Sequence, residues 1–342
     1  MVFAMKISEI KQNILTIFRN WSLAKRIVFF TIVFVVLLAS FMLFKVEKTF
    51  SLINQKVFGK TFHFENDDVY EEENRINILM LGLRGDGDME HGANLTDTMM
   101  VVSIKTDEGR ASLFSIPRDL YVRIPGLNKM EKINYAYAYG MQTTGNGMEM
   151  SALTVQRVAG IPIDHVVVIN FDAFLKLIDT IGGVDVYVPA DFTESSQWGY
   201  TFHVPQGINH MDGETALYYS RSRYSSNDFD RARRQQDVLM ALGTKAMSMG
   251  ILANPIKFNA MLNTLSEGIT TDIDFITMLN LSRYIKLIKK DAAVDRFVFD
   301  VSEKGLLVSG NANGAYILSP VEGMENFSAV KKKFRDAFYT AQ

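Results

Sequence analysis

Three apolar runs decide the fold of the central part of the chain: INILMLGL (Ile76–Leu83), TMMVVSIK (Thr98–Lys105) and ASLFSI (Ala111–Ile116). Each run is short, rich in Ile, Leu, Val and Met, and bounded by polar or Gly-containing segments, as is typical of buried strands. HVVVIN (His165–Asn170) is a fourth run of this kind, and Val184–Val188 is a fifth that follows a pair of glycines.

Helical patterns separate and follow these strands. Strands that alternate with helices predict an α/β or α+β sandwich, with helices on both sides of a central sheet. Further along the chain, we expect edge strands at Val294–Val301 and Ala315–Ser319 and a last helix at Ser328–Thr340. The other predicted helices are Met150–Ala159, Phe171–Ile181, Gly213–Ser220, Asp230–Met249, Pro255–Ser266 and Phe275–Lys290.

Composition excludes several classes of function. The 342 residues carry a formal net charge of −2, so no basic excess indicates nucleic acid as a partner. The chain has no Cys, which excludes disulfides, thiolate metal sites and cysteine nucleophiles. It contains no Walker A loop, no G-x-S-x-G elbow and no H-E-x-x-H motif, and its five His show no zinc spacing.

An uncharged stretch near the N-terminus, Ile27–Phe44, predicts a membrane anchor. Its length corresponds to roughly 27 Å of helix, close to the hydrocarbon thickness of a bilayer. Basic residues precede it, so the positive-inside rule keeps residues 1–26 in the cytoplasm and sends the rest out. The alternatives are a signal peptide cleaved near Leu38-Ala39-Ser40 and a buried core helix. We therefore predict a cytoplasmic tail (1–26), an anchor (27–44), a juxtamembrane stalk (45–74) and one extracytoplasmic domain (75–342).

A cluster of cations is the most informative chemical feature. Arg221 and Arg223 follow a predicted helix, and in an extended segment they lie on the same side of the chain. DRARRQQDVL then opens another helix with Asp230 as its N-cap, and Arg231, Arg234 and Gln235 share one face of it. Cations at a helix N-terminus oppose the helix dipole, which indicates that an anion binds there. The alternative is a solvated basic helix start paired with neighbouring Asp.

Two further cations are candidate site residues: one follows a predicted strand, and the other precedes a predicted helix. Arg118, in SIPRD, follows a strand end, where ligand sites of α/β proteins form, although a surface pair with Asp119 is equally compatible. Lys132, in EKINYAYAYG, is a weaker candidate.

Asp97 begins an otherwise apolar strand and is the candidate magnesium ligand. Mg²⁺ prefers carboxylate and phosphate oxygens, although a turn or cap residue explains Asp97 as well. The preceding loop, RGDGDMEHG (Arg84–Gly92), offers Asp86, Asp88, Glu90 and His91 as second ligands, or it is a surface loop without a function.

Seven segments, in order and spacing, resemble the LytR-CpsA-Psr family. They are INILMLG, LTDTMMVVSI, SIPRDLYV, KINYAYAYG, VVVINFDAFLKLIDTIGGVDVYV, GINHMDGETALYYSRSRY and FDRARRQQDVL, and they cover roughly Arg75–Met247. The resemblance implies a three-layer α-β-α sandwich with a central mixed sheet and a hydrophobic tunnel for a polyprenyl tail. It implies that pyrophosphate is bound by Arg118, Arg221, Arg223, Arg231 and Gln235, with Lys132 nearby, and that Asp97 binds Mg²⁺ or Mn²⁺.

The sequence departs from the family pattern at two positions. Arg84 stands where the family commonly has an Asp that faces the metal, and Leu95 stands where it often has an Arg. We therefore add Arg84 to the pyrophosphate-binding residues and Asp86 to the metal ligands.

The resemblance implies a glycopolymer phosphotransferase of the cell wall. It would move a glycosyl-phosphate polymer from a polyprenyl-pyrophosphate carrier to a peptidoglycan hydroxyl, with Asp97, Arg118, Arg221 and Arg223 as the catalytic residues. A pyrophosphatase with water as acceptor and a lipid-carrier binder or envelope regulator without turnover are the alternatives. We expect a single-pass type II protein of the cell membrane, whose partners are the lipid-linked glycan, peptidoglycan and membrane lipid. The sequence does not indicate the oligomeric state.

Overall fold

The computed structural model describes residues 69–84, 94–250, 265, 268–288 and 294–339. All of them belong to one compact unit that spans Thr49–Gln342. The predicted tail, the anchor at Ile27–Phe44 and most of the predicted stalk lie outside the described residues. None of the helices within the described ranges is long and apolar enough to cross a membrane.

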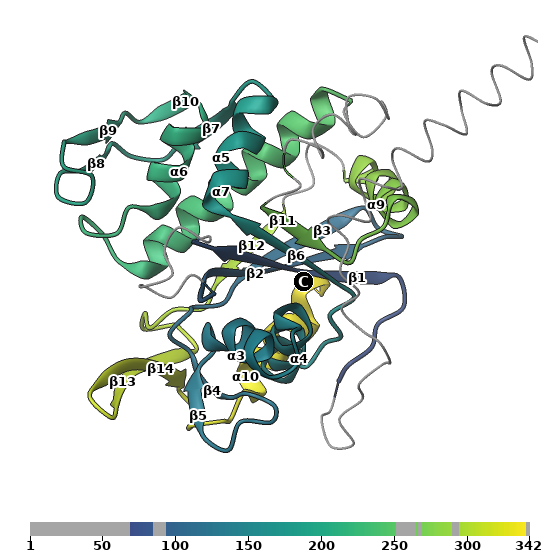
Figure 1. The fold of residues 1–342 in the computed structure, drawn as a ribbon. Helices are drawn as coiled ribbons and strands as arrows, with labels where there is room; N and C mark the ends of the chain where they lie inside the picture. The colour runs from purple at the N-terminus through teal and green to yellow at the C-terminus, as the bar shows by residue number, and fades with distance from the viewer. Residues whose placement is uncertain (1–68, 85–93, 251–264, 266–267, 289–293, 340–342) are drawn as a thin grey trace, which may run out of the picture. The chain divides into compact units, whose positions relative to one another are not determined.

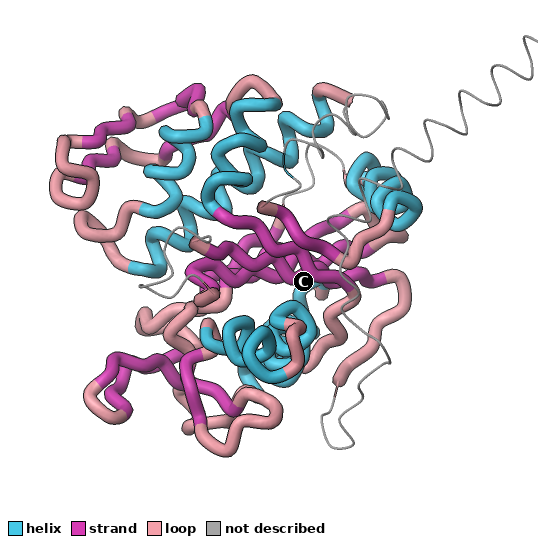
Figure 2. The backbone as a smooth tube through the Cα atoms, viewed as in Figure 1, coloured by secondary structure: helices cyan, strands magenta, loops and turns pink. Residues whose placement is uncertain are grey.

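A six-stranded mixed sheet in the order β11-β6-β1-β2-β3-β12 forms the centre of this unit (Figures 1 and 2). β1 is parallel to β6 and β3 is parallel to β12, whereas β2 is antiparallel to both of its neighbours and β11 is antiparallel to β6. The mixed sheet confirms that part of the predicted fold. The strands are β1 (Arg75–Leu83), β2 (Thr96–Lys105), β3 (Arg110–Ser115), β6 (His165–Asn170), β11 (Ile269–Thr271) and β12 (Asp295–Val298).

Helices cover both faces of the sheet (Figure 1). On one face lie α5 (Phe171–Thr180), α6 (Gly213–Arg221) and α7 (Asp228–Ser248). On the other lie α3 (Tyr135–Thr143), α4 (Gly147–Ala159) and α10 (Ser328–Arg335), followed by the short η3 (Asp336–Phe338). α9 (Phe275–Leu287) also corresponds to a predicted helix, whereas the helix predicted at Pro255–Ser266 lies almost entirely outside the described residues.

Two predicted strands lie elsewhere than expected. β7 (Val184–Val188) is not in the central sheet; it pairs with β10 (Gly207–Met211), and every second residue of β7 is exposed, whereas no residue of β1 is. The predicted edge strand at Ala315–Ser319 is β14 (Ala315–Pro320) of a separate hairpin with β13 (Leu307–Ala312). The other two-stranded ribbons are β4 (Tyr121–Arg123) with β5 (Met130–Lys132) and β8 (Phe192–Glu194) with β9 (Phe202–Val204).

An aromatic cluster joins the β12 side of the sheet to the helix below it. The ring of Phe114 in β3 is fully buried and lies 5.1 Å from Phe297 and 6.2 Å from Phe299, measured between ring centroids. Phe334 of α10 lies 4.2 Å from Phe114 on the opposite face from α7. Burial of several large aromatic side chains makes this edge of the sheet a rigid support.

Candidate functional site

One edge of the central sheet collects the predicted site residues. β1, β3, β6 and β12 run in the same direction, so their carboxyl ends lie at the same edge. The chain leaves β1 at Arg84, passes Arg118 after β3, and enters α5 at Phe171 after β6. Ligands of α/β proteins bind at this edge, because loops and helix N-termini meet there around a crevice.

Asp97 lies at the same edge because β2 runs in the opposite direction and begins there. The pairing of β1 with β2 shifts between Gly82 and Leu83, so Asp97 is the extra residue of a β-bulge. A Cβ atom at Gly82 would lie 2.9 Å from Cβ of Thr98, so the close approach of the strands beside the bulge requires glycine. The bulge thereby directs the Asp97 carboxylate out of the ladder.

The Asp97 carboxylate accepts hydrogen bonds from two arginines. Nε of Arg84 donates to one oxygen at 2.8 Å, and Nη1 of Arg118 donates to the other at 2.6 Å. Arg118 also donates from Nε to Asp228 at 3.2 Å. A single carboxylate therefore orients two guanidinium groups at the carboxyl edge.

These contacts change the acid strength of the groups. Burial raises the pKa of Asp97, but the guanidinium groups of Arg84 and Arg118 outweigh burial and hold this pKa below its ordinary value. Burial lowers the pKa of Arg118, yet Asp97 and Asp228 together raise it above the ordinary value. At neutral pH Asp97 is therefore ionised, and it is a weaker base than an ordinary aspartate.

Arg221 and Arg223 reach the site from the end of α6. Arg221 is the last helical residue and Ser222 is the C-cap, so the prediction of an extended segment at Arg221 is wrong. The helix extends this far because the backbone N–H and the hydroxyl of Ser222 both donate to the carbonyl of Tyr218, at 2.9 and 2.7 Å. The Arg221 guanidinium lies 3.9 Å from the ring centroid of Phe171.

Arg234 has a different role from the one its helical spacing indicated. It is 7% exposed, and its guanidinium donates to the carbonyls of Tyr219 (2.9 Å from Nε) and Ser222 and to the hydroxyl of Ser226 (3.1 Å). It also lies 4.4 Å from the ring centroid of Phe192. Arg234 therefore holds the segment that carries Arg221 and Arg223.

Arg231 and Gln235 come from the first turns of α7. Asn227 is the N-cap, since its side chain accepts from the N–H of Asp230 at 2.8 Å, so the prediction of Asp230 as the cap is wrong. Arg231 is 8% exposed and makes an ion pair with Asp228 at 3.2 Å. Burial lowers the pKa of Arg231, but an arginine remains protonated at neutral pH.

These side chains surround one cavity of about 260 Å³, here called the arginine cavity. Its lining contains five arginines and one carboxylate, namely Arg84, Arg118, Arg221, Arg223, Arg231 and Asp97. A more apolar cavity of about 280 Å³ adjoins it and shares Asp97, Thr98, Arg118, Arg231 and Gln235. Guanidinium groups concentrated in this way suit an anion with several oxygens, such as pyrophosphate.

Lys132 and Asp86 are not among the residues that the structure brings to these cavities. Lys132 donates to Asp119 at 2.6 Å, and Asp119 in turn lies 3.7 Å from Nε of Arg118. Lys132 therefore supports Arg118 indirectly and lines neither cavity. Asp86 lies outside the described residues. Within the described ranges, no group of three or more His, Asp or Glu side chains is arranged to hold a metal ion.

Sequence reasoning missed five residues that line the arginine cavity: Thr98, Phe171, Gln197, Trp198 and Tyr224. The Gln197 side chain accepts from the N–H of Arg223 at 2.9 Å and donates to the carbonyl of Arg221 at 3.2 Å. Trp198 donates to the Ser222 hydroxyl at 2.9 Å. No pattern marks Gln197 and Trp198, because their loop between β8 and β9 meets α6 only in the folded chain.

Comparisons with known proteins identify the family of the chain. The family model described as LytR_cpsA_psr family matches residues 40–329. A protein of Enterococcus faecalis named polyisoprenyl-teichoic acid–peptidoglycan teichoic acid transferase TagU is 34% identical over 211 residues, which are 60% of this chain and 64% of that protein. The match thus spans just under two thirds of this relative's length.

Solved structures show the same fold. The crystal structure of B. subtilis TagV is 28% identical, with a TM-score of 0.61, and the comparison covers 79% of this chain and 100% of that one. A structure of TagT bound to LIIa-WTA is 23% identical, with a TM-score of 0.60, and covers 83% of this chain and 96% of that one. At that identity, the second likeness concerns the fold alone.

Proposed function

This chain belongs to the LytR-CpsA-Psr family, and we propose that it transfers an anionic glycopolymer of the teichoic acid class to peptidoglycan. The carrier is a polyprenyl pyrophosphate and the acceptor is a peptidoglycan hydroxyl. The names of the curated relatives support the reaction class. The observation that carries the proposal is the arginine cavity, in which five arginines surround one carboxylate at the carboxyl edge of the sheet.

The reaction is phosphoryl transfer. A sugar hydroxyl attacks the phosphorus that carries the glycan, the bond from this phosphorus to the bridging oxygen breaks, and polyprenyl phosphate leaves with that oxygen and takes up the proton that the hydroxyl loses. Such transfers need positioning and charge stabilisation more than covalent chemistry from the protein. Arg221, Arg223 and Arg231 bind the pyrophosphate, and Arg118 orients the attacked phosphoryl group. The apolar cavity beside them receives the first part of the lipid tail.

Asp97 acts through the arginines it holds. Because its pKa is lowered and both oxygens accept from guanidinium groups, it is poorly suited to removing the proton of the attacking hydroxyl. Its carboxylate instead orients Arg118 toward the substrate and pairs with Arg84. We therefore propose Asp97 as a positioning residue, and Arg84 as a further cation of the pyrophosphate site.

The described residues around Asp97 do not fit a divalent cation. Both carboxylate oxygens lie within 2.8 Å of guanidinium nitrogens, and no second acid in the described part of the chain completes a ligand set with Asp97. Positive guanidinium groups at these positions repel Mg²⁺. The proposed reaction therefore includes no step on a metal. Binding of Mg²⁺ by Asp97 and Asp86 stays a prediction.

The proposal includes the cellular location. A type II anchor at Ile27–Phe44 would place the arginine cavity outside the cell, where peptidoglycan lies. Protease accessibility in intact protoplasts tests this topology.

Single substitutions of Arg118 and Arg221 test the reaction. The full chain is incubated with a polyprenyl-pyrophosphoryl sugar, labelled in the sugar, and peptidoglycan fragments. We expect label on peptidoglycan, and a loss of at least about 100-fold in kcat/KM for Arg118→Ala and Arg221→Ala, because each removes a cation that stabilises developing charge.

The controls identify the alternatives. Arg123→Ala removes an exposed arginine that pairs with Glu325 away from the site, and it should leave transfer unchanged. Label released as a free sugar phosphate, with or without peptidoglycan, would identify a pyrophosphatase. Tight binding of the lipid without any product would identify a binder and reject the transferase.

A further inference from the structure

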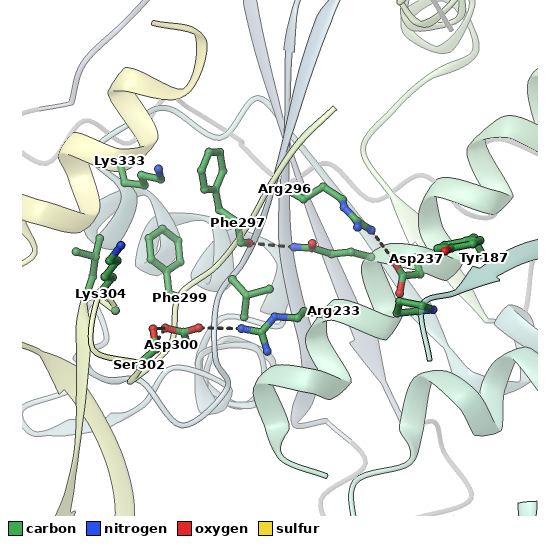
Figure 3. Close-up of a pocket in the computed structure, with 15 residues that line it drawn as sticks. Tyr187, Arg233, Asp237, Arg296, Phe297, Phe299, Asp300, Ser302, Lys304 and Lys333 are labelled. Atoms are coloured by element: carbon green, nitrogen blue, oxygen red, sulfur yellow. Dashed lines mark hydrogen bonds and ion pairs between the residues drawn. The ribbon is translucent and has the colours of Figure 1, made fainter. Parts of the chain in front are cut away.

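A further cavity among the described residues lies outside the arginine cavity, at the open edge of the sheet. It measures about 600 Å³ and is here called the edge cavity. Figure 3 shows it beside β12, the last strand of the sheet, between α7 and α10. Phe297 and Phe299 line it and pack against the buried ring of Phe114. Its aromatic wall is therefore rigid.

Two ion pairs cross the edge cavity and neutralise two of its four cations (Figure 3). Arg233 of α7 donates to Asp300 at 2.9 Å, and Arg296 of β12 makes an ion pair with Asp237 of α7. These pairs tie α7 to β12 and the segment after it. They stabilise the shape of the cavity. Because each pair is neutral, the net charge of the cavity comes from the remaining two cations.

The remaining cations are Lys304 and Lys333. Among the described residues, neither makes an ion pair or a hydrogen bond, and the ammonium of Lys333 lies 3.8 Å from the ring centroid of Phe297. The residue of α10 that precedes Lys333, Lys332, instead makes an ion pair with Asp336 at 2.7 Å. Two lysines that share a cavity without carboxylate partners create a positive potential that attracts an anion, and lysine binds phosphate as a point charge.

The aromatic side chains indicate what the anion is attached to. The Tyr187 side chain, from β7, stands at the opposite rim and is 63% exposed. Phe297 and Phe299 form the wall on the side of the two lysines, and Tyr187 offers an exposed ring on the other side of the cavity (Figure 3). Aromatic rings together with two lysines that lack carboxylate partners among the described residues suit a phosphate-bearing sugar or polyol better than a phosphate ion alone.

The edge cavity adjoins the site already described. Val298 lines both the edge cavity and the apolar cavity that shares Arg118 and Arg231 with the arginine cavity. Gln236 of α7 donates to the Ser115 hydroxyl at 2.8 Å and to the carbonyl of Phe297 at 3.0 Å, which fixes the wall between them.

We propose that the edge cavity is a subsite that binds a phosphate-bearing repeat of the anionic glycopolymer, away from the reacting bond. This inference rests on the proposed transferase function. It gives a binding role to Lys304 and Lys333, which lie in the C-terminal part of the chain. It also explains why these lysines lack carboxylate partners in the described structure.

Binding of a short poly(glycerol phosphate) oligomer to the full chain tests the subsite, with calorimetry as the readout. The oligomer carries neither lipid nor pyrophosphate, so binding does not depend on catalysis. We expect Lys304→Gln with Lys333→Gln to raise Kd at least about 10-fold, because two charge contacts are lost. Lys332→Gln is the matched control on the same helix and should leave Kd unchanged. Uncharged polyglycerol of the same length should bind neither variant nor wild type.

Three results would overturn the inference: an unchanged Kd in the double variant, an equal loss in Lys332→Gln, or equal binding of the uncharged oligomer. Inorganic phosphate that binds as tightly as the oligomer would also reject a polymer subsite. In the transfer assay, the double variant should keep its kcat/KM with a donor of one sugar and lose it with a long anionic polymer. Failure of the transferase itself appears separately, as absence of any product from wild type.

Discussion

At Asp97, one carboxylate accepts from two guanidinium groups within 2.8 Å, and the side chain is 16% exposed. The arrangement joins Arg84, after β1, to Arg118, after β3, through a bulge at the start of β2. If the carboxylate were absent, Arg84 and Arg118 would lose the negative charge that they share, although Arg118 would keep its ion pair with Asp228. Asp97 therefore contributes to stability as well as to the position of Arg118.

The pH dependence of stability follows from the lowered pKa of Asp97. A group whose folded pKa lies below its unfolded value stabilises the protein above the unfolded pKa, and this stability is lost as pH falls through the folded pKa. Asp97→Asn should lower the free energy of unfolding at pH 7 by about 1–2 kcal/mol, given partial solvent screening. Below roughly pH 4 the difference from wild type should shrink.

Urea unfolding of both proteins across this pH range measures the difference. Glu325→Gln, which removes an exposed partner of Arg123, is the control and should give little difference at any pH. A constant gap between wild type and Asp97→Asn from pH 7 to pH 3 would show that the carboxylate charge does not cause the loss.

At the scale of elements, the joint between α6 and α7 determines where the cations stand. Arg234 is buried in this joint and donates to the carbonyl of Tyr219 in α6 and to the carbonyl of Ser222 and the hydroxyl of Ser226 in the connecting segment. Glu194 of β8 binds the same segment, because its carboxylate accepts from the N–H of Ser225 at 2.9 Å and from the hydroxyl of Ser225 at 3.2 Å. The loop that carries Arg223 is thus held from two sides.

Arg234→Ala should lower the free energy of unfolding by about 3 kcal/mol, because buried carbonyls lose a charged donor. Arg234→Lys should recover only a minor part, since an ammonium group does not reproduce the guanidinium fork. Arg233→Ala, at a 51% exposed side chain on the same helix, is the control and should cost less than about 1 kcal/mol. Equal losses at positions 233 and 234 would contradict the structural role of Arg234.

At the scale of the whole molecule, charge is distributed unevenly. The formal net charge is −2, yet five arginines and one aspartate line the arginine cavity. Attraction of an anion to this cavity is therefore a local property that the net charge hides.

We expect the affinity of the full chain for inorganic pyrophosphate to fall several-fold between low salt and about 0.5 M KCl, because salt screens charges in a cavity open to water. Arg223→Gln should weaken binding at low salt and reduce the salt dependence. Calorimetric titrations at several salt concentrations give both quantities. An affinity independent of salt, with Arg223→Gln equal to wild type, would contradict an electrostatic pyrophosphate site.

The sequence alone predicted every strand of the central sheet except β11, and most of the cations of the site. The apolar runs of β1, β2, β3 and β6 are recognisable because burial on both faces leaves continuous hydrophobic sequence. Arg118 was recognisable for a related reason, since a residue just after a buried strand lies at a sheet edge. The order and spacing of seven motifs indicated the family, which the family match confirms.

Only the tertiary structure decided how those residues are paired and what surrounds them. In the folded chain Lys132 donates to Asp119, Arg84 donates to Asp97, and β7 pairs with β10 outside the central sheet. It also built the edge cavity from Tyr187, Asp237, Phe297 and Lys333, which lie far apart in the sequence. Local patterns report whether a residue is buried and in which element it lies. Contacts between distant segments depend on how the elements pack, and this packing is a property of the whole fold.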